Sequence, residues 1–230
     1  LVALAFVHIV ALHHVGSNNP DGVEIKKKKD DTGKPLDGIP FHPYYTVKDL
    51  VIIVVFLFLF SLVVFFAPEM GGYFLEHPNF EPADPLKTPD HIAPVWYFTP
   101  FYSILRSVTI DLGGPFNSKF LGVLAMFASI GLLFVLPWLD RCQVKSIRYR
   151  GFSYKLALIL FVIAFIILGY LGTLAPTPGR TLVAQICMAV YFGFFILMPW
   201  YTAREKTKPV PERVTEHHSP VEKLTHGHAD

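Results

Sequence analysis

A histidine lies inside an apolar stretch at the start of the chain, where a polar side chain is costly and is therefore a candidate for function. It is His8, within the run LVALAFVHIVAL of residues 1–12. Its ring could ligate haem iron, or it could hydrogen-bond a neighbouring helix as an ordinary buried side chain. Taken alone, the pattern favours the ordinary side chain. None of the later apolar runs carries a histidine, so a second iron ligand would have to come from outside this sequence.

A second group combines residue types that could serve a quinone. His13-His14 is followed by Ser17-Asn18-Asn19, and Lys48-Asp49 stands at the start of the next apolar run. A quinone needs donors to its two carbonyls and a proton source during reduction; histidine titrates near neutral pH and aspartate can relay protons. Helix capping is the alternative, because Ser and Asn suit helix ends and Thr46 with Asp49 resembles a capping box. The two interpretations are compatible.

A third group is aromatic. Residues 92–108 read IAPVWYFTPFYSILRSV, with Pro94-Val95-Trp96-Tyr97 followed by Tyr102 and Arg106. This stretch is too apolar for a solvent loop, and long loops inside compact proteins are usually functional. Aromatic walls with a few hydroxyl groups suit a flat apolar ring. We expect a short helix near the membrane surface, folded back over a cavity; a simple interfacial anchor is the alternative.

The elements that must position these groups are membrane-spanning helices. The chain is 52% hydrophobic and only 17% charged, whereas soluble domains have roughly 25% charged residues. Nearly uncharged runs of about 20 residues can cross a hydrocarbon core of about 30 Å, and in lipid such runs must be helical. The sequence predicts an all-α integral membrane bundle, with spans at about 47–67, 118–138, 152–172 and 180–200 after a half-helix at about 1–14.

Basic residues give the spans a direction. The segments 16–46, 139–151 and 201–230 are rich in Lys and Arg, whereas 68–117 has only Lys87 and Arg106 and 173–179 has neither type. The rich and poor segments alternate with the spans, so the positive-inside rule predicts that the rich ones are cytoplasmic. The net charge of +2 is too small to suggest nucleic-acid binding.

Four parts follow from this pattern. They are the end of a haem-binding helix with a cytoplasmic loop (1–46), a span with an outer loop (47–117), three spans (118–200) and a flexible cytoplasmic tail (201–230).

The lysine run in the first loop is most simply solvated, with lipid contact as the alternative. The tail histidines could bind metal, but disorder is the simpler interpretation. The chain begins with apolar residues too short to span, so we expect it to start within a helix. Neither cysteine belongs to a C-x-x-C motif.

Three strings carry a family resemblance: HHVGSNNPDGVE, IPFHPYYTVKDL and APVWYFTPFYSILRS, in this order. They are similar to cytochrome b of the bacterial, ubiquinone-type quinol–cytochrome c reductase, and the resemblance extends over roughly residues 1–200. It implies that the segments run from the end of the fourth helix of that subunit through its eighth. It also implies two b haems in the full subunit and ubiquinone as substrate.

The resemblance assigns roles by position. His8 matches a ligand of the high-potential haem, which reverses the interpretation from the residues alone. The quinone-reduction site is implied for His13, Ser17, Asn18, Phe41, Tyr45, Lys48 and Asp49. The quinol-oxidation pocket is implied for Ile92, Pro94, Trp96, Tyr97, Phe98 and Tyr102.

One position departs from the family. The motif Pro-Glu-Trp-Tyr has Val95 in place of the glutamate, which in the family is given the role of accepting a proton from quinol. Valine cannot accept a proton, so another group or water must do so. Asp90, His91 and Tyr102 are the nearby candidates.

The function implied is a protonmotive quinone cycle in a bacterial inner membrane, catalysed by the complete subunit in its complex; the chain by itself is expected to be inactive. Implied partners are a Rieske-type iron–sulfur protein, a c-type cytochrome, the lipid membrane and a second copy of the complex, and no nucleic acid. A proton-coupled transporter with His8 and Asp49 as its proton path is one alternative. A haem-free assembly subunit, tolerant of changes at His13 and Asp49, is the other.

Overall fold

The computed structural model describes residues 1–72, 80–87 and 92–214, and in these ranges all regular structure is helical except one isolated bridge between Lys29 and Pro35. The chain forms two compact units, one comprising Leu1–Glu24 with Ala93–Asp230 and the other Ile25–Ile92. Residues 90, 91, 217, 218, 226 and 228, which include two candidate proton acceptors and the tail histidines, lie outside the described residues.

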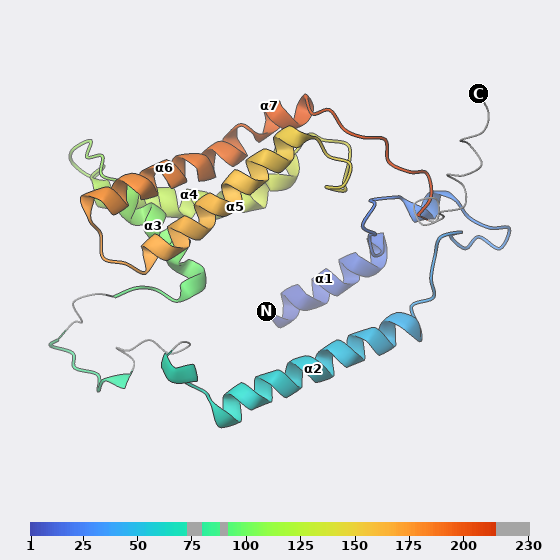
Figure 1. Ribbon diagram of the computed structural model, residues 1–230, viewed down its shortest axis with the longest axis horizontal. Coiled ribbons are helices and arrows are strands. Elements are labelled where there is room, and N and C mark those ends of the chain that lie inside the picture. The colour runs from blue at the N-terminus through green and yellow to red at the C-terminus, as the bar shows by residue number, and fades with distance from the viewer. Residues whose placement is uncertain (73–79, 88–91, 215–230) are drawn as a thin grey trace, which may run out of the picture. The chain divides into compact units, whose positions relative to one another are not determined.

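Three long helices lie side by side in the first unit: α4 (Ser118–Leu139), α5 (Phe152–Gly172) and α6 (Pro178–Ile196) (Figure 1). Their shared interior is aromatic. The ring centroid of Phe161 lies 4.6 Å from that of Phe194 and 5.2 Å from that of Tyr191. The Tyr191 hydroxyl, fully buried, donates to the Ser129 carbonyl at 3.0 Å and so satisfies its only polar atom. Large apolar side chains such as Phe134, which is 77% exposed, cover the outside.

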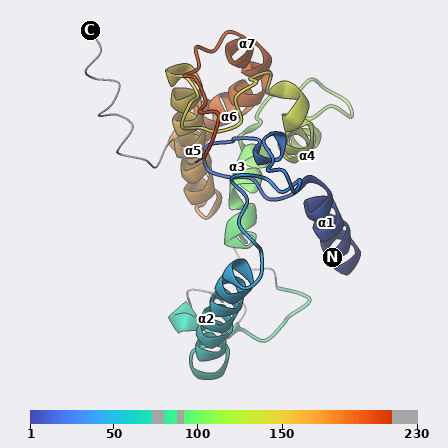
Figure 2. The same ribbon diagram turned by 90° about the vertical axis from the view of Figure 1, so that its right-hand side faces the viewer.

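A short helix, α3 (Thr99–Ser107), packs against all three long helices (Figure 2). It follows the 3-10 turn η4 (Trp96–Phe98). Glycines permit the approach, because a Cβ atom at Gly172 would overlap the backbone of Thr99 and one at Gly122 would overlap the Leu105 carbonyl. The predicted short helix in 92–108 is therefore confirmed, and it is held against the bundle by backbone contacts that only glycine allows.

Among the described residues, four helices are long and apolar enough to cross a membrane: α2 (Tyr44–Phe66), α4, α5 and α6. In α2, which belongs to the second unit, the mean hydropathy is 3.0 and no residue is buried. A helix this apolar needs lipid or protein around it. The shorter α1 (Val2–Val15) is equally unburied and ends at Gly16, whose φ of 81° suits glycine.

Two boundaries differ from the predictions. Thr46 is not the N-cap of α2, because the helix begins earlier, after Pro43, and the Phe41 carbonyl accepts a hydrogen bond from the Tyr45 amide at 2.8 Å. The last span ends at Ile196 rather than near residue 200, and α7 (Met198–Ala203) follows. Pro199 explains this break, since proline has no amide hydrogen to continue the helical ladder. The remaining short turns are η1 (Ile25–Lys27) and η2 (Met70–Gly72).

Candidate functional site

In the predicted outer pocket, the rings of Trp96 and Tyr97 are exposed, and the residue that anchors their turn is buried. Trp96 is 77% exposed and Tyr97 63% exposed, and their rings meet edge to face at 5.6 Å. The Thr99 hydroxyl, which is buried in α3, donates to the Trp96 carbonyl at 2.7 Å and so ties η4 to the helix. Pro94, Phe98 and Tyr102 are half-buried. Ile92 belongs to the other unit.

Arg106 fixes the orientation of Tyr102. Its guanidinium lies 4.6 Å from the centroid of the Tyr102 ring. The two terminal nitrogens of Arg106 donate to the carbonyls of Leu171 and Leu174, at 2.7 and 3.0 Å, at the end of α5. The arginine therefore joins the tyrosine to the end of a long helix, and the sequence reasoning did not give it this role.

A small cavity of about 20 Å³ opens beside Arg106. It is lined by Ser103, Ser107, Arg180 and neighbours on α5 and α6. A space of this size suits a water molecule and not a quinone ring. The exposed faces of Trp96 and Tyr97 are an aromatic surface outside this cavity.

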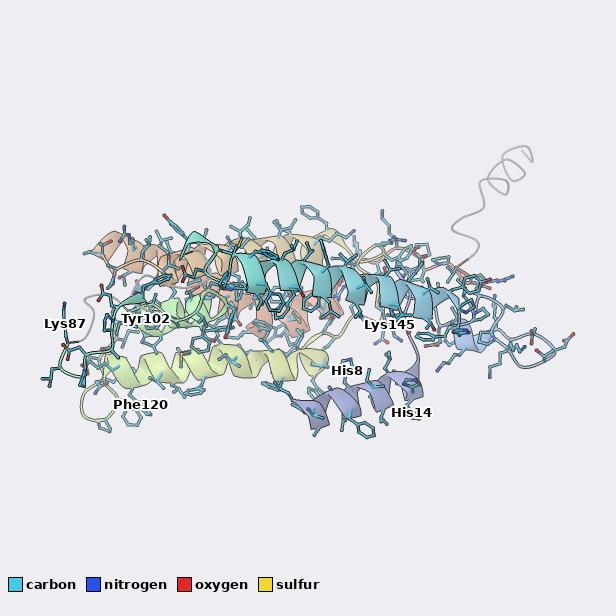
Figure 3. The ribbon with its side chains drawn as sticks, turned by 90° about the horizontal axis from the view of Figure 1, so that it is seen from below. His8, His14, Lys87, Tyr102, Phe120 and Lys145 are labelled. Atoms are coloured by element: carbon cyan, nitrogen blue, oxygen red, sulfur yellow. The ribbon has the colours of Figure 1, made fainter. Side chains whose placement is uncertain are left out.

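His8 and His13 both lie on α1 but differ in their surroundings. Figure 3 labels His8 and His14 on this helix. The Nδ1 atom of His13 lies 2.8 Å from the Ile9 carbonyl oxygen. Because a carbonyl can only accept, Nδ1 must carry the hydrogen, and Nε2 is left free to exchange a proton. His8 has no hydrogen-bond partner among the described residues and stands between exposed apolar side chains. Its imidazole is available as a ligand.

The segment after α1 is a compact turn. The Asn19 side chain donates to the Val23 carbonyl at 2.7 Å and accepts from the Val23 amide at 3.1 Å. The Asn18 side chain accepts from the Asn19 amide at 2.9 Å. Ser17 and Asn18 are exposed, as ligand-binding groups must be.

In the second unit, the candidate residues cluster at the start of α2. The rings of Phe41 and Tyr45 stack with centroids 6.1 Å apart. The ammonium of Lys48 lies 5.6 Å from the centroid of the Tyr45 ring. Asp49 is exposed on the first turns of the helix. An aromatic surface with an acid and a base beside it could bind a flat ring and exchange protons with it.

The sequence reasoning missed a buried ion cluster around Arg150, between α4 and α5. The Arg150 guanidinium donates to the carboxylates of Asp140 and Glu205, and it lies 3.5 Å from the centroid of the Tyr154 ring. Arg150 is 5% exposed and the Glu205 side chain is fully buried. Burial lowers the pKa of Arg150, but the bonds to the two carboxylates outweigh it and hold the pKa above its ordinary value. In the sequence, Arg150 is only one of several basic residues of segment 139–151.

The loop that carries the ion cluster also contacts the turn after α1. Arg148 and Tyr149 both donate to the buried carboxylate of Asp21, at 2.9 and 3.0 Å. Tyr102 and Lys145 lie at opposite ends of the helix bundle (Figure 3). The first unit thus has an aromatic segment at one end and this loop with the turn after α1 at the other.

The family model and the relatives that match this chain are all described as cytochrome b. The family model for the C-terminal part of cytochrome b, cytochrome b6 and petD matches residues 82–192. Cytochrome b of Allochromatium vinosum is 58% identical over 94% of this chain and 52% of that protein. Cytochrome b of Rickettsia bellii is 44% identical over 93% of this chain and 49% of that protein. The chain therefore spans about half the length of these relatives.

A solved structure has the same fold. A chain of a hyperthermophilic respiratory Complex III superposes with a TM-score of 0.74 at 39% identity, covering 89% of this chain and 48% of that one. The likeness extends beyond the segment that the family model matches.

Proposed function

Because the chain belongs to the cytochrome b family, of which it represents the C-terminal part, we propose that it contributes to the membrane subunit of a respiratory quinol–cytochrome c reductase. The observation that carries this proposal is 58% identity along 94% of the chain, together with a fold that matches a Complex III chain with a TM-score of 0.74. The protein is a multi-pass membrane protein. Its location in a bacterial inner membrane, with the basic segments cytoplasmic, is part of the proposal.

At the outer site, the quinol ring would lie against Trp96 and Tyr97, with Pro94 and Phe98 completing the apolar lining; the role of Ile92 rests on the resemblance alone. Tyr102 would take the role that Val95 cannot. Its phenol would pass its own proton to solvent water and then take the proton of the quinol hydroxyl, and the Arg106 guanidinium beside the ring favours the phenolate formed between these two transfers. Val95 is 49% exposed and offers only apolar contact.

At the inner site, the chemistry is proton donation to a reduced quinone. In the first unit, a His13 ring protonated at both nitrogens would donate from Nε2 to a quinone oxygen. In the second unit, Asp49 with Lys48 would relay protons from the cytoplasm. Ser17 and Asn18 would supply hydrogen bonds, and Phe41 with Tyr45 an aromatic surface. The first unit carries His13, Ser17 and Asn18, and the second carries the others.

His8 fits the role of a haem ligand. Its imidazole has no hydrogen-bond partner among the described residues and stands in an apolar helix, so it could hold a haem within the membrane. When bound, b haems would supply one-electron transfer across the membrane, one through His8 and a histidine outside this chain. The partners we propose are a Rieske-type iron–sulfur protein, a c-type cytochrome and a second copy of the complex.

A stepwise redox difference spectrum of the native assembly that contains this chain tests the proposal. We expect two b-type signals that reduce in separate steps, one of which an inhibitor of the quinone-reduction site perturbs. Absence of any b-type signal would exclude the proposal and favour a transporter or a haem-free assembly subunit.

Replacing Tyr102 by Phe in the complete complex is expected to slow quinol oxidation by about 100-fold, since a positioned proton acceptor contributes on the order of 10²–10⁴ in rate. The rate would be measured as reduction of b haem by quinol with the quinone-reduction site inhibited. Tyr170→Phe is the matched control, because Tyr170 is an exposed tyrosine on α5. An unchanged rate and pH profile in Tyr102→Phe would remove Tyr102 from this role.

A further inference from the structure

The turn after α1 is anchored by a loop that the family resemblance assigns no role. We propose that Arg148, together with Tyr149, is a positioning residue for quinone reduction: through the buried carboxylate of Asp21 it holds Ser17 and Asn18 in place. This inference rests on the proposed function, because it takes these two residues to contact quinone. Arg148 itself would not touch the ligand.

The contact is centred on one oxygen. The Asp21 residue is 1% exposed, and its Oδ1 atom accepts from the Arg148 guanidinium at 2.9 Å and from the Tyr149 hydroxyl at 3.0 Å. A buried carboxylate needs such donors, because removing a charge from water without partners is costly. Burial and the neighbouring Asp21 carboxylate raise the pKa of Tyr149, so its hydroxyl remains a donor.

The two backbones also meet directly. The Ser146 hydroxyl donates to the Pro20 carbonyl at 2.6 Å. Gly22 has φ +69°, and a Cβ atom there would lie 3.1 Å from the Ser146 amide nitrogen and 3.3 Å from the Lys145 Cβ. The turn at residues 20–22 therefore packs against the loop at residues 145–149, and both side-chain and backbone contacts hold Asp21 in place.

Hydrogen bonds within the turn connect Asp21 and its neighbours to the candidate quinone-binding residues. The Gly22 amide donates to the Asn19 carbonyl at 3.0 Å, and the Asn19 side chain bonds both polar backbone atoms of Val23. Asn18 bonds the Asn19 amide. A shift of Asp21 would therefore be passed to Asn18 and Ser17 and not absorbed by a flexible segment. Small misplacements of binding groups carry large kinetic costs.

The test uses the complete subunit in its complex, with the quinol-oxidation site inhibited. Reduced b haem is re-oxidised by increasing concentrations of a short-chain ubiquinone, which gives an apparent KM and a maximal rate. In Arg148→Ala we expect the apparent KM to rise about tenfold, as loss of a charge-assisted hydrogen bond suggests. Tyr149→Phe should raise it about threefold, since a neutral donor is worth less. Haem content and quinol oxidation should stay unchanged in both.

Two further variants separate positioning from general damage. Arg148→Lys keeps a cation and should recover most of the wild-type KM. Lys145→Ala removes a charge of the same loop whose pair with Glu24 spans 3.9 Å and is largely exposed, while it keeps the Cβ atom that faces Gly22. It should behave as wild type.

An unchanged KM in Arg148→Ala and Tyr149→Phe would overturn the inference. So would equal losses of quinone reduction and quinol oxidation that Arg148→Lys does not repair. If Arg148→Ala does not assemble, Tyr149→Phe decides. If quinone does not re-oxidise any b haem in the wild-type complex, the proposed function is overturned, and this inference falls with it.

Discussion

Replacing His8 by Ala in the complete subunit is expected to remove one of the two b-type haem signals and to leave the other. The reason is local. His8 stands between exposed apolar side chains of α1 and has no hydrogen-bond partner among the described residues, and a haem that His8 helped to hold would lose that bond in the variant. The difference spectrum per subunit should then fall by about half, because one of two similar chromophores is lost.

The matched control for His8 is His14→Gln, on the same helix but at its polar end. It should retain both haem signals. A His8→Ala protein that keeps both signals with unchanged potentials would show that His8 is an ordinary side chain facing a neighbouring helix, which is the interpretation that the residues alone favour. If His8→Ala loses both signals because the complex does not assemble, the haem signals are measured in His8→Met instead, since methionine retains an iron-binding side chain.

Replacing Arg150 by Ala is expected to destabilise the assembled protein by about 3–5 kcal/mol, the range found when one partner of a buried ion pair is removed. The loss leaves the fully buried Glu205 carboxylate and the partly buried Asp140 carboxylate without their shared cation. The Glu205 carboxylate also accepts from the Gly151 amide at the start of α5. One guanidinium thus joins the end of α4, the start of α5 and the segment after α7.

Thermal inactivation of the detergent-solubilised complex measures this effect, as the midpoint temperature and the half-life of the haem spectrum. Arg141→Ala is the matched control, since Arg141 is exposed and its backbone amide, which bonds the Thr202 hydroxyl at 3.0 Å, is kept. Arg150→Lys should recover only part of the loss, because an ammonium cannot bond two carboxylates in the planar geometry of guanidinium. Equal stability of Arg150→Ala and Arg141→Ala would show that the cluster is not a main source of stability.

Helix placement follows from the sequence because it depends on local composition. Apolar runs predicted α2, α4 and α5 to within a few residues. Backbone groups in lipid must bond within their own segment, so the length of an apolar run nearly fixes the helix. The errors, at Thr46 and near residue 200, both arise where a nearby proline decided the boundary.

The candidate site was predictable only in part. Motif strings directed attention to His8, His13, Asp49 and Tyr102, and their roles in haem and quinone binding stay predictions. The supporting residues could not be found in this way. Arg106, Arg148 and Arg150 look alike in the sequence, as basic residues in loops or at helix ends, and nothing local distinguishes a solvated arginine from a buried one.

The sequence by itself determined that this is a helical membrane protein, where its helices run and which segments carry the candidate chemistry. Only the tertiary structure decided that α3 lies against three long helices, that Asp21 meets Arg148 and that Arg150 meets Glu205. The physical reason is range. Hydropathy and capping act between residues a few positions apart, whereas an ion pair forms between groups that the fold brings together from distant parts of the chain.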